Sequence, residues 1–139
     1  MTLATIIDTG PFVAYLSRAD AHHDWAGEQF ERFEPPFLTC EAVVSESCFL
    51  VERSGGDPAL VLDTVARGGV RLDFSLAAHL EGIHRLMNRY KDVGISLADA
   101  CLIRMSEVHS ASQIMTIDRD FLIYRRDGRR TIPLIAPFD

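Results

Sequence analysis

Short runs of aliphatic and β-branched residues alternate along this chain with longer segments whose apolar residues recur every three or four positions. The short runs predict strands, and the longer segments predict amphipathic helices. The predicted strands are residues 3–7, 37–38, 70–74 and 113–117. The predicted helices are residues 11–16, 24–33, 41–52 and 75–91, with two more that begin near residues 57 and 96. This alternation predicts an α/β fold with a parallel sheet between two layers of helices.

The run at residues 3–7 is continuously apolar apart from Thr5, which is typical of a strand buried on both faces, and we expect it to be the central strand. With 139 residues, 47% of them hydrophobic, the chain fits a single domain over residues 1–139. No apolar stretch reaches the roughly 18 residues needed to span a bilayer, and the N-terminus lacks the basic region of a signal peptide. We therefore expect a cytoplasmic protein with no membrane contact.

The cysteine content agrees with that compartment. The chain has three cysteines, which is an odd number, and no CxxC pair. Cys40 and Cys48 fall on one predicted helix, about 12 Å apart along its axis, which is too far for a disulfide bond. We expect reduced and mostly buried thiols.

Four carboxylates occupy positions that such a fold would bring to one edge of the sheet. Asp8 and Asp118 each follow a predicted strand directly. Glu46 lies in the second turn of a helix that follows a strand, and Asp99 lies in the first turn of the helix that precedes strand 113–117. Because ligands bind at the carboxyl ends of parallel strands, we predict that the four acids meet at that edge.

Carboxylates that are packed together repel one another, and their burial is costly unless a cation or protons intervene. Oxygen ligands without nearby His or Cys favour Mg²⁺ or Mn²⁺ over zinc. Such an ion lowers the pKa of water and offsets charge that develops on a phosphate, so the acids predict phosphodiester hydrolysis. His22 and His23 are adjacent and would not share a helix face, so we expect a surface or loop role for them rather than a zinc site.

Each acid also has an ordinary structural explanation. Asp8 would suit a turn at the end of a strand, and Asp99 would suit a capping box that begins at Ser96. Asp118 would suit the cap of a short helix, and Asp120 equally so. Glu46 is harder to explain in this way, because it lies at the margin of its helix's apolar stripe. Ordinary roles for all four acids at one edge would be a larger coincidence than an ordinary role for any one.

Each acid also lies within a short motif. The four motifs are Ile6-Ile7-Asp8-Thr9-Gly10-Pro11, Thr39 followed by Glu46 seven residues later, Ser96-Leu97-Ala98-Asp99-Ala100, and Thr116-Ile117-Asp118-Arg119-Asp120-Phe121. In this order and at this spacing they cover nearly the whole chain, which resembles PIN-domain proteins and is most similar to toxin ribonucleases of the VapC type. One motif alone would be a weak signal.

The resemblance implies a three-layer α/β/α PIN-like fold with a central parallel sheet of about five strands. It also implies an endoribonuclease that depends on Mg²⁺ or Mn²⁺, forms homodimers, and is the toxin of a toxin–antitoxin pair, inhibited by a cognate antitoxin. By position, the catalytic and metal-binding acids would be Asp8, Glu46, Asp99 and Asp118, with Thr9, Thr116 and Asp120 in supporting roles. Gly10 departs from many relatives, which carry Ser or Asn there, so one possible polar group beside the metal is missing.

Two other classes of function compete with a ribonuclease. A signalling receiver domain also carries Mg²⁺-binding acids at the carboxyl edge of a parallel sheet, but it needs a lysine after a late strand. Lys91, the only lysine, falls at the end of a predicted helix. A PIN fold that binds nucleic acid or a partner without catalysis is the second alternative, and the four intact acids argue against it.

The net charge of −6 argues against a protein that coats nucleic acid through an all-over basic surface, but not against a nuclease with a local basic strip. Four arginines flank the turn signal Asp127-Gly128. They are Arg125, Arg126, Arg129 and Arg130. We predict a hairpin with arms at residues 121–124 and 131–135, whose arginine-bearing tip lies within reach of the acids and binds RNA phosphates. A merely solvated charged turn is the alternative.

Overall fold

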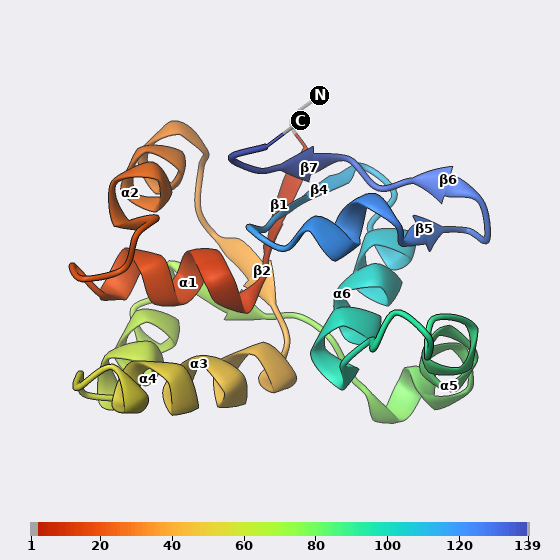
Figure 1. Ribbon diagram of the computed structural model, residues 1–139, viewed down its shortest axis with the longest axis horizontal. Coiled ribbons are helices and arrows are strands. Elements are labelled where there is room, and N and C mark those ends of the chain that lie inside the picture. The colour runs from red at the N-terminus through yellow and green to blue at the C-terminus, as the bar shows by residue number, and fades with distance from the viewer. Residues whose placement is uncertain (1–2, 139) are drawn as a thin grey trace.

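The computed structural model describes residues 3–138, so the first two residues of the N-terminal segment considered above lie outside the described residues. A five-stranded parallel sheet forms the middle of the molecule, with strand order β3-β2-β1-β4-β7 (Figure 1). Its strands are β1 (Ala4–Ile7), β2 (Phe37–Thr39), β3 (Val70–Leu72), β4 (Ser112–Met115) and β7 (Leu134–Ile135). The predicted α/β class, the parallel sheet of about five strands and the central place of β1 are confirmed.

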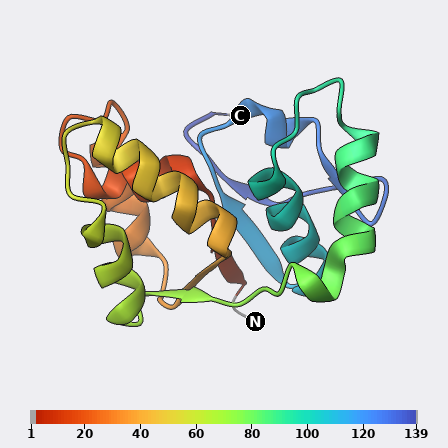
Figure 2. The same ribbon diagram turned by 90° about the horizontal axis from the view of Figure 1, so that it is seen from below.

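Helices cover both faces of the sheet. One group consists of α1 (Thr9–Leu16), α2 (His23–Arg32), α3 (Glu41–Arg53) and α4 (Ala59–Ala66). The other consists of α5 (Leu80–Arg89) and α6 (Leu97–Val108). Figure 2 shows the two groups on opposite sides of the strands. Among the described residues, no helix is both long enough and apolar enough to cross a membrane.

The register of the central strands explains why the core is centred on them. Ile6 of β1 lies opposite Ile114 of β4 on one side and Leu38 of β2 on the other. Ile6, Ile7 and Ile114 are fully buried, as expected for a parallel strand that has helices on both faces.

Several helix and strand boundaries differ from the prediction. The strand predicted over residues 70–74 ends at Leu72, and the helix predicted over residues 11–16 begins at Thr9. The helix predicted over residues 75–91 begins instead as a 3₁₀ turn, η1 (Ala77–His79), because the backbone at His79 leaves the helical region before α5 starts. The strand predicted to end at residue 117 ends at Met115. Asp118 therefore lies three residues past the strand rather than directly after it.

The predicted hairpin is correct only at its turn. Strand β5 (Arg125–Arg126) pairs antiparallel with β6 (Arg130–Thr131) around Asp127 and Gly128, which both have positive φ angles. The predicted arms are wrong. Residues 119–122 form a 3₁₀ helix, η2 (Arg119–Leu122), and β7 leaves the hairpin to pair with β4 because it adds a buried edge to the main sheet.

Candidate active site

Asp8 lies at the carboxyl end of the central strand, where it caps helix α1. Its Oδ1 accepts a hydrogen bond of 2.7 Å from the backbone N–H of Thr9, and its Oδ2 accepts one of 2.7 Å from the Thr116 hydroxyl. Only 6% of the residue is exposed. The predicted turn role and a functional role are thus compatible, because the capping carboxylate lies at the edge of the sheet where ligands bind.

Asp118 comes to the same edge from the neighbouring strand. Its backbone N–H donates to the Thr116 hydroxyl at 3.0 Å, so Thr116 contacts Asp8 and Asp118 together. Its Oδ1 accepts from the backbone N–H of Asp120 at 2.9 Å and caps η2, as one of the ordinary explanations predicted. Thr116, which was predicted to support the site, therefore contacts two of the acids through one hydroxyl group.

Asp99 reaches the site from the first turn of α6. Ser96 caps that helix by accepting a 3.0 Å hydrogen bond from the backbone N–H of Asp99, which confirms the N-terminal half of the predicted capping box. The Asp99 carboxylate accepts a 2.9 Å hydrogen bond at Oδ2 from the hydroxyl of Tyr124. Asp99 is thus held by two residues from different parts of the chain.

The charges of these three acids act on one another. Burial, with a smaller contribution from the charges of Asp99 and Asp118, raises the pKa of Asp8 to about 7. The hydrogen bonds from Thr116 and Thr9 oppose the change. Burial also raises the pKa of Asp99, and Asp118 adds to that effect. Burial and the neighbouring Asp118 raise the pKa of Asp120 as well. An acidic pocket that favours protons in this way equally favours a cation.

Glu46 is the exposed member of the four acids. It lies on α3, which packs against α6, but its side chain is exposed to solvent. Within residues 3–138, no three Asp, Glu, His or Cys side chains are arranged closely enough to hold a metal ion as they stand. The donor set fits Mg²⁺ or Mn²⁺ because it consists of hard carboxylate oxygens.

The predicted arginine cluster is divided between buried and exposed positions. Arg126 is buried, and its Nη1 donates to the carbonyl oxygens of Ser106 and Ser110, so this guanidinium serves the packing of the hairpin on α6. The Nη1 atom of Arg125 donates hydrogen bonds to the backbone carbonyl oxygens of residues 122–124. Arg129 and Arg130 are the exposed pair.

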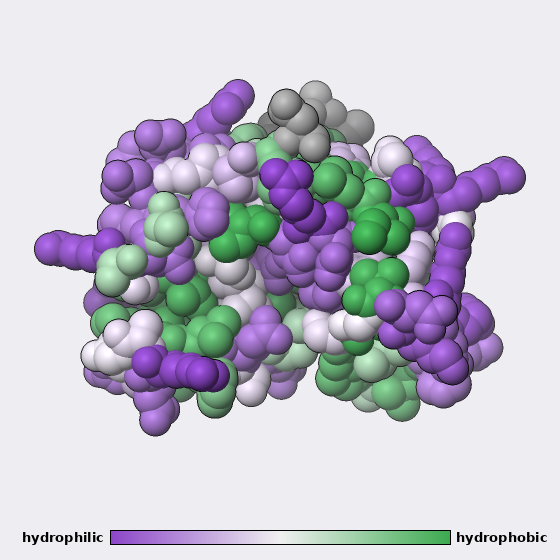
Figure 3. Space-filling model, in the orientation of Figure 1, coloured by the Kyte–Doolittle hydropathy of each residue, from purple (hydrophilic) through white to green (hydrophobic). Residues whose placement is uncertain are grey.

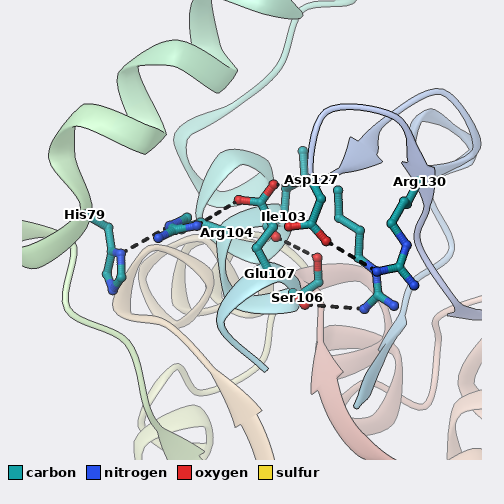
Figure 4. A network of polar contacts seen from close by, with 8 residues as sticks. His79, Ile103, Arg104, Ser106, Glu107, Asp127 and Arg130 are labelled. Atoms are coloured by element: carbon teal, nitrogen blue, oxygen red, sulfur yellow. Dashed lines mark hydrogen bonds and ion pairs between the residues drawn. The ribbon is translucent and has the colours of Figure 1, made fainter. Parts of the chain in front are cut away.

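The tip of the hairpin lies along α6, away from the acids. Figure 4 shows Asp127 between Glu107 and Arg130, with Arg104 and His79 further along on the side of Glu107. The backbone N–H of Asp127 donates to Glu107 at 2.7 Å. Glu107 is eight residues past Asp99, which is about 12 Å along the helix. The tip therefore lies about 12 Å along α6 from Asp99, and the binding of RNA phosphates by its arginines stays a prediction.

Two residues near the site were missed by the sequence analysis. Tyr124 was assigned to a hairpin arm, yet it donates to Asp99. Cys101 lies against Cys40, and their thiol–thiol hydrogen bond lowers the pKa of Cys40 and raises that of Cys101. Both contacts join segments that are distant in sequence, so no local sequence pattern predicts them. All three cysteines are free, as expected.

The adjacent histidines have local roles, as predicted. The His23 ring contacts the backbone carbonyl of Ala14 at 2.8 Å, and the His22 backbone N–H donates to Asp20 at 2.8 Å. These contacts tie the start of α2 to the end of α1, and they involve none of the four acids.

A sheet edge with clustered acids on this α/β/α fold defines a nuclease-like domain, and the similarities of the chain agree. No protein-family model matches the chain. It is 32% identical over 116 residues to Ribonuclease VapC26 of Mycobacterium tuberculosis, a match that covers 82% of this chain and 86% of the relative. Its fold is similar to that of Mycobacterium tuberculosis VapC20, a toxin that cleaves the sarcin–ricin loop, with a TM-score of 0.74 at 22% identity over 84% of this chain and 92% of that one. The chain belongs to the VapC family of PIN-domain ribonucleases.

Proposed function

We propose that this protein is an endoribonuclease that depends on Mg²⁺ or Mn²⁺, hydrolyses RNA phosphodiester bonds, and acts as the toxin of a toxin–antitoxin pair. Family membership supports ribonuclease activity. The observation that carries the metal-dependent mechanism is the buried carboxylate of Asp8, which is held by Thr9 and Thr116 and repelled by Asp99 and Asp118. A buried group under that repulsion is stabilised by a bound cation.

In this mechanism Asp8, Asp99, Asp118 and Glu46 are the residues that would hold the metal. A bound Mg²⁺ or Mn²⁺ supplies an activated water and offsets the charge that develops on the phosphate. Thr116 and the N–H of Thr9 fix both oxygens of Asp8, so that its carboxylate does not rotate away from the site. Preorganised ligands of this kind lower the cost of assembling the reacting groups.

Cleavage of a labelled single-stranded RNA tests the proposal. The parent protein should cleave in Mg²⁺ or Mn²⁺ and stop in EDTA. Single changes Asp8→Asn, Asp99→Asn, Asp118→Asn and Glu46→Gln should each reduce the rate by orders of magnitude with the fold intact. Asp63→Asn, on the exposed surface of α4, is the matched control and should leave the rate unchanged. Full activity of Asp8→Asn, or of the parent protein in EDTA, would contradict the metal mechanism.

The alternative functions have less support. A receiver domain needs a lysine near the acids, whereas Lys91 lies in the exposed turn after α5. A non-catalytic binding module would not need Asp8, Asp99 and Asp118 to interact electrostatically, as they do here. We therefore favour the catalytic proposal over both.

We further propose that the protein acts in the cytoplasm as a homodimer and binds a cognate antitoxin. Exposed apolar side chains on α1 and α3 support an additional interface, namely Tyr15, Phe49 and Leu50, with Phe49 60% exposed. Figure 3 shows hydrophobic surface in the region of α1, α3 and α4. A protein that remains monomeric by light scattering at micromolar concentration would contradict the dimer.

A further inference from the structure

Tyr124 is a buried tyrosine whose hydroxyl faces the acids. It lies between η2 and β5, and its side chain is fully buried. The hydroxyl donates to Oδ2 of Asp99 at 2.9 Å, and the charges of Asp118 and Asp120 also act on it. A buried tyrosine hydroxyl needs a hydrogen-bond partner, and here the partner is a carboxylate of the proposed metal site.

The position of this hydroxyl is fixed by the aromatic rings around it. The Tyr124 ring contacts Phe121 and Tyr90 edge-on, each with a centroid separation of 5.1 Å. The Tyr90 hydroxyl in turn accepts a 2.9 Å hydrogen bond from the backbone N–H of Arg125, the residue that follows Tyr124. The tyrosine therefore has a single well-defined orientation, with its oxygen at Asp99.

The three buried or half-buried acids are each held by hydrogen bonds, but by different kinds of donor. Asp8 is held by a backbone N–H and by Thr116, and Asp118 is held by the backbone N–H of Asp120. The cap at Ser96 fixes the backbone of Asp99, but it does not fix the rotation of the carboxylate. The hydroxyl of Tyr124 does this, since it binds one particular oxygen.

We propose that Tyr124 is a positioning residue of the active site, whose hydroxyl orients the carboxylate of Asp99 for binding the divalent metal. This inference rests on the proposed function. Residues that orient a metal ligand through a hydrogen bond are as much part of a site as the ligand, and their loss typically weakens metal binding about 10–100-fold. Tyr124 also belongs to the segment that follows Asp118, so it ties the first turn of α6 to the β4 side of the site.

Calorimetric titration with Mn²⁺ tests this role on the parent protein and two matched variants. Tyr124→Phe removes only the hydroxyl, and the dissociation constant for Mn²⁺ should rise about tenfold or more. Tyr15→Phe is the matched control, because it removes a hydroxyl from an exposed tyrosine on α1. It should leave the dissociation constant within about twofold of the parent value. Circular dichroism and thermal unfolding establish that both variants are folded.

Cleavage kinetics give a second readout that a purely structural role would not produce. With Tyr124→Phe, the rate at limiting Mn²⁺ should fall and recover at saturating Mn²⁺, while the KM for RNA stays unchanged. In an Asp99→Asn background, adding Tyr124→Phe should cause no further loss, because the effect acts through Asp99. Equal Mn²⁺ affinities of the parent protein and Tyr124→Phe, or a full additional loss in the double variant, would overturn the proposal. Absence of Mn²⁺ binding by the parent protein would instead overturn the metal-dependent function itself.

Discussion

The hydroxyl of Thr116 donates a 2.7 Å hydrogen bond to Oδ2 of Asp8, although 108 residues separate the two in sequence. The bond crosses between neighbouring parallel strands, because β1 and β4 pair in register with Ile7 opposite Met115. The same hydroxyl accepts the backbone N–H of Asp118. One buried side chain therefore sets the relative positions of two acids that approach from different strands.

Replacing Thr116 with valine should test this link, since valine keeps the shape and removes the hydroxyl. We expect Thr116→Val to reduce cleavage about 10–100-fold, because Asp8 loses a hydrogen bond that orients it. The free energy of unfolding should fall by about 1–3 kcal/mol, because the buried N–H of Asp118 loses its acceptor. Cleavage rates and urea unfolding measure the two effects.

Thr5→Val is the matched control for this change. Thr5 is also buried on β1, and its hydroxyl accepts a 3.3 Å hydrogen bond from Gln113 without contact with any of the acids. The Thr5→Val variant should lose some stability and keep full cleavage activity. Equal losses of activity in the two variants would show that Thr116 acts only through the stability of the sheet.

The raised pKa of Asp8 predicts an unusual dependence of stability on pH in metal-free protein. Because Asp8 has a pKa of about 7 when folded and an ordinary, lower pKa when unfolded, the folded state binds its proton more tightly. The stabilisation is fully present below the unfolded pKa and is lost as pH rises through about 7. In EDTA, the unfolding free energy should therefore decrease between about pH 4 and about pH 7, by an amount on the order of a few kcal/mol.

Asp8→Asn isolates this contribution. The variant carries no titrating group at position 8, so the decrease in stability with pH should be clearly smaller than in the parent protein. Adding Mg²⁺ at about pH 8 should stabilise the parent protein more than the variant, because a ligand that binds only the folded state raises its stability. Identical pH profiles for the two proteins would mean that Asp8 does not experience the burial and repulsion described here.

Gly10 has a packing requirement that predicts the effect of restoring the residue found in many relatives. A Cβ atom at this position would lie 2.5 Å from Cγ1 and 2.8 Å from Cδ1 of Ile117, which directly precedes Asp118. Gly10→Ser should therefore destabilise the protein by about 1–3 kcal/mol through overpacking. Ile117→Ala should relieve the clash, so the double variant should be more stable than the sum of the single effects predicts. Strict additivity in thermal or urea unfolding would count against this contact.

The contribution of the exposed hairpin arginines to RNA binding should depend on the length of the RNA. Changing Arg129 and Arg130 to Ala should weaken binding of a long single-stranded RNA and flatten its salt dependence, with the cleavage position unchanged. A dinucleotide should be unaffected, because the hairpin tip lies about 12 Å along α6 from Asp99. Arg126→Ala should lower stability instead, since that guanidinium is buried against backbone carbonyls.

The control for the exposed pair is a double change of Arg18 and Arg67 to Ala. Both are exposed and lie at the opposite edge of the sheet, one after the end of α1 and the other before β3. This variant loses the same charge at a distance from the acids and should bind RNA like the parent protein. An equal loss of RNA affinity in both double variants would show that the effect depends only on net charge and not on the position of the arginines.

The sequence predicted those parts of the fold that depend on local patterns. The apolar runs located β1 and β4, and the capping motif at Ser96 located the start of α6 with Asp99. The start of α1 was predicted two residues late, at Pro11, because the cap formed by Asp8 was not recognised. It predicted less well where tertiary contacts decide. Residues 134–135 resemble a hairpin arm, but they pair with β4 because the sheet offers a buried edge. The contact of Tyr124 with Asp99 depends on the path of the chain after η2, which no periodicity encodes.

Asp8, Asp99 and Asp118 are proposed to hold a divalent cation together. A crystal structure of the protein soaked in Mn²⁺, with an anomalous difference map, is the most direct test. We expect an anomalous peak about 2.0–2.2 Å from carboxylate oxygens of Asp8 and at least one of the other two acids, with Glu46 turned inward from its exposed position. A well-ordered site that is empty at high Mn²⁺ concentration, or a peak bound by other residues, would contradict it.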